Sequence, residues 1–440
     1  MLLRYLKGLT YNSVAELRMK KTFLFLSIIL IVCQTLMAQD KDNSENLVSC
    51  VEYSNIFDNI KTICDKDKGK LWGINMYAPI LCIDKNRDLW SNQRDPQDQL
   101  LKCGECFIGK YPIDKSIANS TTNVFGQKWV MLALPIPTND LDRNILFCHE
   151  LFHYWQDSLG HVSRPYNNVH LEAKDARVLL KLEWNAFLSA CKTNNSLLRQ
   201  TAIRDGLTFR KHRQQKYSKY YRDETSFEIL EGLAEYTGIK LSVLSDSMYL
   251  HILDKKVEMY MQKENLVRTY AYLSGAIMGY LLDKSTNEWR KHIDGNSDLG
   301  SLLQQTYNIV IPADRESQIQ QRKALYDYEN IICFENRRDS IQAINKKQLI
   351  ELFTQDIKKL PLKNMQISFD PNSTIPLENI GNIYKNARIV DDWGILETKG
   401  NGSILISEDW ETVILPDAKS IKVDNNVEET ESWKLTFKGR

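Results

Sequence analysis

The sequence predicts an α+β protein that is mainly helical, and three observations lead to this fold class. Apolar residues recur at helical spacing over much of residues 140–355. Residues 128–134 form an apolar run that ends before Pro135 and Pro137, a pattern typical of a buried strand. Beyond Pro361, short apolar runs separated by Gly, Asn and Asp predict a small β domain.

Residues 1–38 are expected to be a signal peptide. Met19-Lys20-Lys21 gives a basic start, Phe23 to Val32 is almost wholly apolar, and Ala38 is a small residue at the expected cleavage point. The apolar stretch is shorter than the roughly 20 residues of a membrane span. We expect Met19 to be the true start, and the mature protein to be secreted or periplasmic in a bacterium, with no membrane span.

Two alternatives would keep this segment at a membrane, namely an uncleaved anchor or a lipid on Cys33. A lipid-attachment site usually has a small residue before its cysteine, whereas Val32 precedes Cys33. Cleavage is therefore favoured over lipid anchoring.

Residues 39–110 form a Cys-containing N-terminal region. Removal of the signal leaves an even number of cysteines, so disulfides of undetermined pairing are expected in an oxidising compartment. These are Cys50, Cys64, Cys82, Cys103, Cys106, Cys148, Cys191 and Cys333. The region shows little helical periodicity and is expected to be rich in loops. Cys103-Gly104-Glu105-Cys106 could instead begin a zinc ribbon, but no second pair has that spacing.

Residues 111–360 are expected to form the catalytic domain, mostly helical after residue 140. Thr138 or Asn139 can cap a helix over 140–158 that has acidic residues in its first turn. Further helices are expected over 197–217, 223–241, 264–283 and 314–355. The final domain, 361–440, has turn signals at 399–402 and 424–426.

The charge balance excludes one class of function. The chain has 57 basic and 56 acidic side chains and a net charge of +1. A general nucleic-acid binder needs a surplus of Lys and Arg to displace counterions. We therefore expect no nucleic-acid partner.

The motif His149-Glu150-Leu151-Phe152-His153 points to a metal site. Residues four apart lie on one face of a helix, so both imidazoles can reach one ion. Glu150 can take a proton from a metal-bound water. The alternative is a buried helix whose two His are simply hydrogen-bonded.

The third ligand of a catalytic zinc must come from elsewhere in the chain. The best candidate segment runs from Phe227 to Gly238 and contains Leu230-Glu231-Gly232-Leu233-Ala234-Glu235-Tyr236. Together with the His-Glu-x-x-His motif, it resembles the gluzincin zinc peptidases, and in particular a group of exported bacterial proteins of unknown substrate. The resemblance implies a zincin-like catalytic domain, Zn²⁺ bound by His149, His153 and Glu231, and close helix packing at Gly232.

Two further residues follow from the same resemblance. Glu235 is implied to accept the free N–H of His149 and so to orient that ring. Tyr272, in Tyr272-Leu273-Ser274-Gly275, is implied to stabilise an oxyanion. The alternative for Tyr272 is an ordinary core position.

The resemblance covers about residues 128–285 and lacks the element with which aminopeptidases of this family bind the substrate amine. Glu183 and Glu228 are rival third ligands, although pairing of Glu183 with Arg177 or a nearby Lys is preferred. Cys148 is expected to be a structural thiol or part of a disulfide. The other histidines have no ligand spacing and are expected to be surface or ordinary polar residues: His161, His170, His212, His251 and His292.

These observations predict a zinc metallopeptidase that acts on a peptide or protein, with Glu150 as general base and the strand over 128–134 as the sheet edge above the site. A non-peptide amide or ester is a possible substrate of the same chemistry. The alternative function is surface binding by a zincin scaffold that performs no catalysis.

Overall fold

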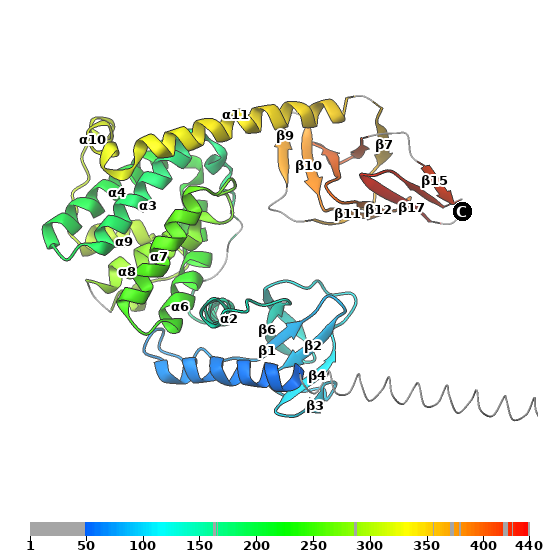
Figure 1. The fold of residues 1–440 in the computed structure, drawn as a ribbon, viewed down its shortest axis with the longest axis horizontal. Coiled ribbons are helices and arrows are strands. Elements are labelled where there is room, and N and C mark those ends of the chain that lie inside the picture. The colour runs from blue at the N-terminus through cyan, green and yellow to red at the C-terminus, as the bar shows by residue number, and fades with distance from the viewer. Residues whose placement is uncertain are drawn as a thin grey trace, which may run out of the picture. The chain divides into compact units, whose positions relative to one another are not determined.

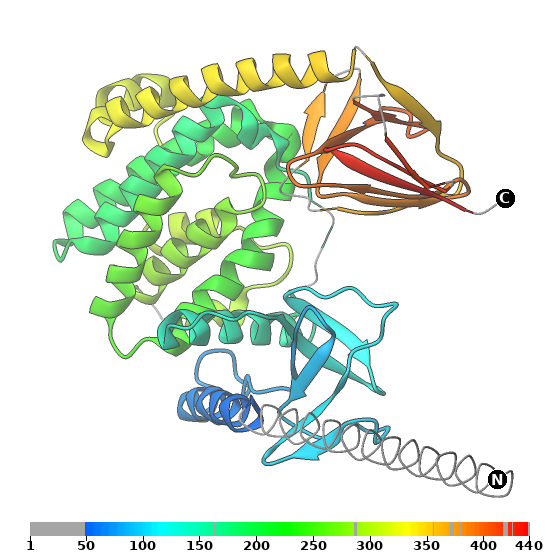
Figure 2. The ribbon, with the colours of Figure 1, turned by 45° about the vertical axis from the view of Figure 1, so that its right-hand side comes forward.

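The computed structural model describes residues 49–438 apart from 162–163, 165, 286–287, 355, 370–373, 378–379, 417–420 and 425. The expected signal peptide, with Met19 and Cys33, lies outside the described residues. About 50% of the chain is helical and 19% is strand, which confirms the predicted α+β class with helix in excess (Figures 1 and 2). No helix among the described residues is long and apolar enough to cross a bilayer.

The chain divides into two compact units, and each is built from several segments. The first contains Met1–Arg164, Glu228–Tyr249 and Leu282–Asp298. The second contains Pro165–Phe227, Leu250–Leu281 and Leu299–Arg440.

A six-stranded sheet forms one layer of the first unit, in the order β3-β4-β2-β1-β6-β5. Its strands are β1 (Ile80–Ile83), β2 (Asp88–Ser91), β3 (Leu101–Cys103), β4 (Cys106–Lys110), β5 (Ser120–Val124) and β6 (Gln127–Ala133). Neighbours are antiparallel except β1 and β6, which are parallel. The strands on either side of position 110 therefore belong to one sheet.

The expectation that residues 128–134 form the sheet edge is wrong. β6 covers 127–133 but pairs on one side with β1 and on the other with β5. The edge strand is β5, with the sequence Ser-Thr-Thr-Asn-Val, of which only Val124 is buried. Such a polar strand lacks the apolar run that revealed β6.

The expectation that 39–110 is rich in loops is also wrong, because residues 49–67 form a helix and four strands follow. Cys50, Phe57, Ile60 and Cys64 are buried in the helix at spacings of three, four or seven residues. Two of these four are cysteines, so the apolar periodicity of this helix is visible only when cysteine is treated as a core residue.

One cysteine pair of the described residues is at bonding distance. The sulfur atoms of Cys50 and Cys103 lie 2.08 Å apart. The other described cysteines form no disulfide with one another, and all are buried except Cys333: Cys64, Cys82, Cys106, Cys148, Cys191 and Cys333.

Helix α2 (Asp140–Trp155) packs against the sheet and against α6 (Leu233–Ser242) in the first unit (Figure 1). Asn139 caps α2, because its side-chain oxygen accepts a hydrogen bond from the Asp142 backbone N–H at 3.1 Å. The two helices approach closely at Gly238, where an added Cβ would lie 2.6 Å from the Ile145 carbonyl oxygen.

The segment before α6 departs from α-helical geometry. Helix α5 (Tyr221–Phe227) continues into a π-helical turn, η3 (Glu228–Gly232), and then into α6. The expected helix over 223–241 is therefore three consecutive pieces.

The second unit contains most of the remaining helices. They are η1 (Val169–Glu172), α3 (Lys174–Lys192), α4 (Ser196–Lys216), η2 (Ser218–Tyr220), α7 (Asp246–Met261), α8 (Tyr270–Asp283), α9 (Leu299–Thr306), α10 (Arg315–Arg322), η5 (Lys323–Tyr326) and α11 (Tyr328–Leu352), of which α7 and α8 run into the first unit. The expected helix over 314–355 is interrupted at Asp327, which has a φ of 62°.

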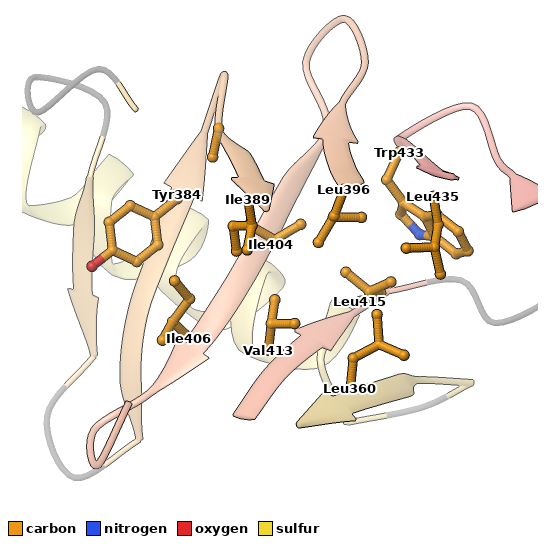
Figure 3. Close-up of a cluster of buried hydrophobic side chains, with 11 residues drawn as sticks. Leu360, Tyr384, Ile389, Leu396, Ile404, Ile406, Val413, Leu415, Trp433 and Leu435 are labelled. Carbon is orange, nitrogen blue, oxygen red and sulfur yellow. The ribbon is translucent and has the colours of Figure 1, made fainter. Parts of the chain in front are cut away.

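The C-terminal β region of the second unit consists of two sheets. Their orders are β7-β14-β13-β10-β9 and β15-β16-β17-β12-β11-β8. The strands are β7 (Lys358–Pro361), β8 (Gln366–Ser368), β9 (Ile375–Leu377), β10 (Gly381–Lys385), β11 (Arg388–Asp391), β12 (Gly394–Thr398), β13 (Ser403–Ser407), β14 (Thr412–Leu415), β15 (Ile421–Asp424), β16 (Val427–Glu429) and β17 (Trp433–Phe437). Tyr384, Ile404 and Ile406 of one sheet pack with Leu396 and Trp433 of the other in a single buried cluster (Figure 3).

Candidate metal centre

His149 and His153 lie one turn apart on α2, and Glu231 lies in the π-helical turn η3 that precedes α6. All three belong to the first compact unit. Single π-turns within α-helices occur frequently at functional sites. The close contact between α2 and α6 at Gly238 brings the two helical segments together next to these residues.

The donor atoms of the three residues form a small triangle. The Nε2 atoms of His149 and His153 are 3.1 Å apart. Each Nε2 atom lies 3.3 Å from Oε2 of Glu231. Bonds of roughly 2.0–2.2 Å to a tetrahedral ion would separate its ligand atoms by about 3.3–3.5 Å. The triangle therefore matches, within a few tenths of an ångström, three corners of a tetrahedral site.

The outer nitrogen of His149, Nδ1, donates a hydrogen bond to a carboxylate. His149 Nδ1 lies 3.1 Å from Oε2 of Glu235, and both residues are buried. An ionised carboxylate only accepts hydrogen bonds, so Nδ1 carries the proton. With Nδ1 protonated, the neutral ring has its lone pair on Nε2, which faces Glu231.

Gln156 orients His153 in the way that Glu235 orients His149. Its Oε1 lies 2.9 Å from His153 Nδ1, while its Nε2 donates to the backbone oxygens of Ile229 at 3.3 Å and Leu230 at 3.0 Å. Because the amide nitrogen is engaged by two carbonyls, the atom facing His153 must be the oxygen. The His153 lone pair is then also on Nε2.

Two imidazole lone pairs and a carboxylate therefore converge on one point. In this arrangement no proton lies between the three atoms, and they repel one another unless a cation joins them. A proton on His149 Nε2 is the other way to supply positive charge. Burial lowers the pKa of His149, but the hydrogen bonds to Glu231 and Glu235 outweigh it and raise the pKa to about 10.

That proton does not satisfy the whole cluster. It can lie between His149 and Glu231, but the His153 Nε2 atom still faces both of them at 3.1 and 3.3 Å. A divalent cation would accept all three lone pairs at once. The residues present thus form a group that could hold a metal ion.

The Glu231 carboxyl is held in its charged form. Burial raises its pKa, but hydrogen bonds with His149 and His153 outweigh that effect and hold the pKa well below its usual range. An ionised oxygen ligand is what a metal ion requires.

Glu150 follows His149 on α2 and is only 5% exposed. Its Oε2 atom has no hydrogen-bond partner among the described residues. Burial is the main reason why its pKa is raised. A buried carboxyl oxygen without a partner costs free energy, so such a group suggests a reactive instead of a structural role.

The rival ligand Glu183 is engaged elsewhere. It is fully buried in the second unit and pairs with Arg210 at 3.2 Å and Arg213 at 2.7 Å. Arg177, the partner preferred from the sequence, pairs instead with Glu335. Glu183 therefore has a structural explanation.

The other residues considered in the sequence analysis have different outcomes. Glu228 is buried at the start of η3 but is not part of the metal-capable group. Tyr272 is half-buried on α8, in the second unit, and its role in stabilising an oxyanion stays a prediction. The assumption that the remaining histidines are ordinary polar residues missed that His161 and His170 are 2% and 5% exposed.

Sequence reasoning missed Gln156 and Gly238. Gln156 is three residues after His153, so its position one turn further along the helix was a usable signal. Gly238 is seven residues after Glu231 and makes the close approach that was assigned to Gly232. The sequence offered no comparable signal for the π-turn.

The comparisons with known proteins add no family. No protein-family model, curated protein or solved structure matches this chain.

Proposed function

We propose that this protein is a zinc-dependent hydrolase, with Zn²⁺ held by His149, His153 and Glu231. The observation that carries the proposal is the convergence of two imidazole nitrogens and one carboxylate oxygen, 3.1–3.3 Å apart, which a single proton cannot satisfy together. Two imidazoles and a carboxylate suit zinc, and three protein ligands leave a position open for water or substrate.

A bound zinc ion would supply a Lewis acid that acidifies water and polarises a carbonyl group. Glu150 then acts as the general base. Its unpartnered Oε2 can accept the proton of the attacking water and return it to the leaving group. Glu235 and Gln156 keep the two imidazoles in the required tautomer.

We propose a peptide bond as the substrate, so that the protein acts as a metallopeptidase. The outer edge of β5 has no strand partner among the described residues. An extended peptide can pair with such an edge through backbone hydrogen bonds. We therefore assign to β5 the substrate-binding role that the sequence analysis gives to residues 128–134.

The test of the general base is the variant Glu150→Gln. We expect it to retain zinc and to hydrolyse a peptide library about 10²–10⁴-fold more slowly than wild type, because the amide cannot accept the proton. Asp142→Asn, an exposed change on the same helix, is the matched control. Undiminished cleavage by Glu150→Gln would refute the mechanism.

The test of the third ligand is the zinc content of Glu231→Ala, measured by mass spectrometry after dialysis. We expect loss of the metal, whereas Glu228→Gln should retain it. Zinc retained by Glu231→Ala and lost by Glu228→Gln would move the role to Glu228.

The peptide library also discriminates between classes of function. If the zinc-loaded wild type cleaves nothing beyond the Glu150→Gln background, the site binds without catalysis. If simple esters or non-peptide amides are hydrolysed and peptides are not, the hydrolase proposal stands and the peptidase proposal fails.

A further inference from the structure

Three cysteines meet at the β3 edge of the six-stranded sheet in the first unit. Cys50, in the first turn of helix 49–67, forms the disulfide with Cys103 of β3. Cys106, the first residue of β4, lies beside this bond. Its Sγ atom is 3.5 Å from the backbone oxygen of Cys50 and 3.3 Å from that of Cys103. The sulfur of Cys106 therefore borders the backbones of both bonded cysteines, and the proposed hydrolysis gives this group no use.

Cys103 and Cys106 close a two-residue hairpin. They are register partners of β3 and β4, and Gly104 and Glu105 form the turn between them. Directly opposed residues of an antiparallel pair have Cα atoms about 4.5–5.5 Å apart. A disulfide joins residues whose Cα atoms are roughly 4.4–6.8 Å apart. Cys106 can therefore replace Cys50 as the partner of Cys103 while the two strands stay paired.

The three cysteines differ in their access to solvent. Cys50 and Cys106 are both 0% exposed. Cys103 is half-buried on the edge strand β3, between the exposed residues Lys102 and Gly104. A Cβ added to Gly104 would meet no atom within 4 Å, so the turn is open to solvent. Of the two bonded cysteines, Cys103 is thus the one that a thiol from solution can attack.

We propose that Cys50, Cys103 and Cys106 form a thiol–disulfide exchange site for a small thiol of the glutathione class. The external thiolate attacks the Cys103 sulfur, the S–S bond to Cys50 breaks, and Cys50 leaves as a thiolate that takes a proton from water. Cys106, as a thiolate, then attacks the Cys103 sulfur of the mixed disulfide and releases the external thiol. One S–S bond has replaced another and Cys50 has become a thiol in place of Cys106, so no oxidant or reductant is consumed.

The exchange removes the covalent link between helix 49–67 and β3. The rest of the helix keeps its contacts, because Tyr53 stacks on Trp90 with ring centroids 4.7 Å apart and Asn59 donates a 2.8 Å hydrogen bond to Asn144 of α2. The first turn, which contains Cys50, is therefore the part that is released. The exchange is independent of the proposed hydrolysis, and either proposal can fail without the other.

Burial keeps the exchange slow at neutral pH. It raises the pKa of the Cys106 thiol to about 11. Because the thiolate is the attacking species, roughly one Cys106 in 10⁴ is reactive at pH 7, and about a hundredfold more at pH 9. The site is therefore best tested in mildly alkaline solution.

The experiment is disulfide mapping of the whole protein after incubation with equimolar reduced glutathione at about pH 9, without oxygen. Acid stops the reaction, and free thiols are then blocked with a maleimide in denaturant. Cleavage after Lys102 and Lys110 leaves Cys103 and Cys106 in one peptide, so an internal disulfide is recognised by its mass and by the absence of the maleimide. We expect this peptide to appear together with an equal amount of maleimide-blocked Cys50.

Cys106→Ser should stop the reaction after its first step, so that glutathione accumulates on Cys103 and no internal disulfide forms. Cys82→Ser is the matched control, because it also removes a fully buried thiol from this sheet. β2 separates β1, which carries Cys82, from β4, and neighbouring strands are about 4.8 Å apart, so Cys82 is too distant to attack the hairpin. This variant should exchange as the wild type does. If Cys106→Ser is unfolded, the mapping of the wild type still decides the point.

Four outcomes would overturn the proposal. The wild type could keep only the Cys50–Cys103 bond, or be reduced at all three cysteines with no internal disulfide. Glutathione could be found on Cys50 instead of Cys103, or could accumulate equally in the wild type and in Cys106→Ser. Zinc content and peptide hydrolysis, measured on the same samples, test the hydrolase proposal separately.

Discussion

Each imidazole of the candidate metal centre is oriented by a residue that is not itself a ligand. Glu235 accepts from His149 and Gln156 accepts from His153. Gln156 also donates to two carbonyls of the η3 turn, next to Glu231. A single amide side chain therefore sets the tautomer of one ligand and the position of another.

Gln156→Leu should lower zinc affinity by about 10–100-fold, because His153 loses the acceptor of its Nδ1 proton and the η3 carbonyls lose their donor. Competition with a chelator measures the change. Ser158→Ala, at the same end of α2, should leave the affinity unaltered. Equal affinities in the two variants would show that Gln156 does not orient the site.

The convergence of His149, His153 and Glu231 depends on the contact between α2 and α6. Gly238 permits it, since a Cβ there would meet the Ile145 backbone oxygen at 2.6 Å and the His149 Cβ at 3.4 Å. A backbone oxygen in a helix cannot move aside as a flexible side chain can. The π-turn then brings Glu231 to the same face as the two histidines.

Gly238→Ala should lower the free energy of unfolding by about 1–3 kcal/mol, because overpacking outweighs the gain of about 1 kcal/mol in helix propensity. It should also weaken zinc binding as α6 shifts away from α2. Gly206→Ala is the matched control, since its Cβ would meet the Phe187 side chain in the second unit.

Chemical denaturation and chelator competition on both variants test this prediction. We expect Gly206→Ala to lose stability but to keep its zinc affinity. Unchanged zinc affinity in Gly238→Ala would show that the helix contact does not control the metal site.

Across the whole molecule, the features that could be predicted from the sequence are those marked by a local pattern of residues. The helix carrying His149 and His153 is predictable from apolar periodicity and a capping residue, and β6 from an apolar run. β5 is polar, and helix 49–67 places cysteines at its buried positions. The π-turn depends on how α6 packs, so no local pattern marks it.

Acid stability depends on a buried charge network in the second unit. Glu224 bonds to Arg213 and His170. Burial raises its pKa, but Arg213, the hydrogen bond with His170 and Arg210 outweigh this and hold the pKa well below the usual range. A carboxyl whose folded pKa is depressed stabilises the fold above its unfolded value of about 4.3 and loses that contribution as the pH falls below it.

Glu224→Gln should therefore be less stable than wild type at neutral pH, by about 3–5 kcal/mol, since it leaves buried Arg charge unpaired. The difference should shrink as the pH falls below about 4.3. Urea denaturation between pH 3 and 7 measures it, with the exposed Glu316→Gln as control. Parallel stability curves for wild type and Glu224→Gln would contradict the assignment.

The first unit is assembled from three separated stretches of chain, and this has a consequence for biosynthesis. His149 and His153 leave the ribosome well before Glu231, with residues 165–227 of the other unit between them. The nascent chain thus presents two imidazoles without their carboxylate partner, and distant contacts form slowly. We expect a stable metal complex only after the stretch ending at Asp298 has emerged, so that metal loading follows synthesis instead of accompanying it.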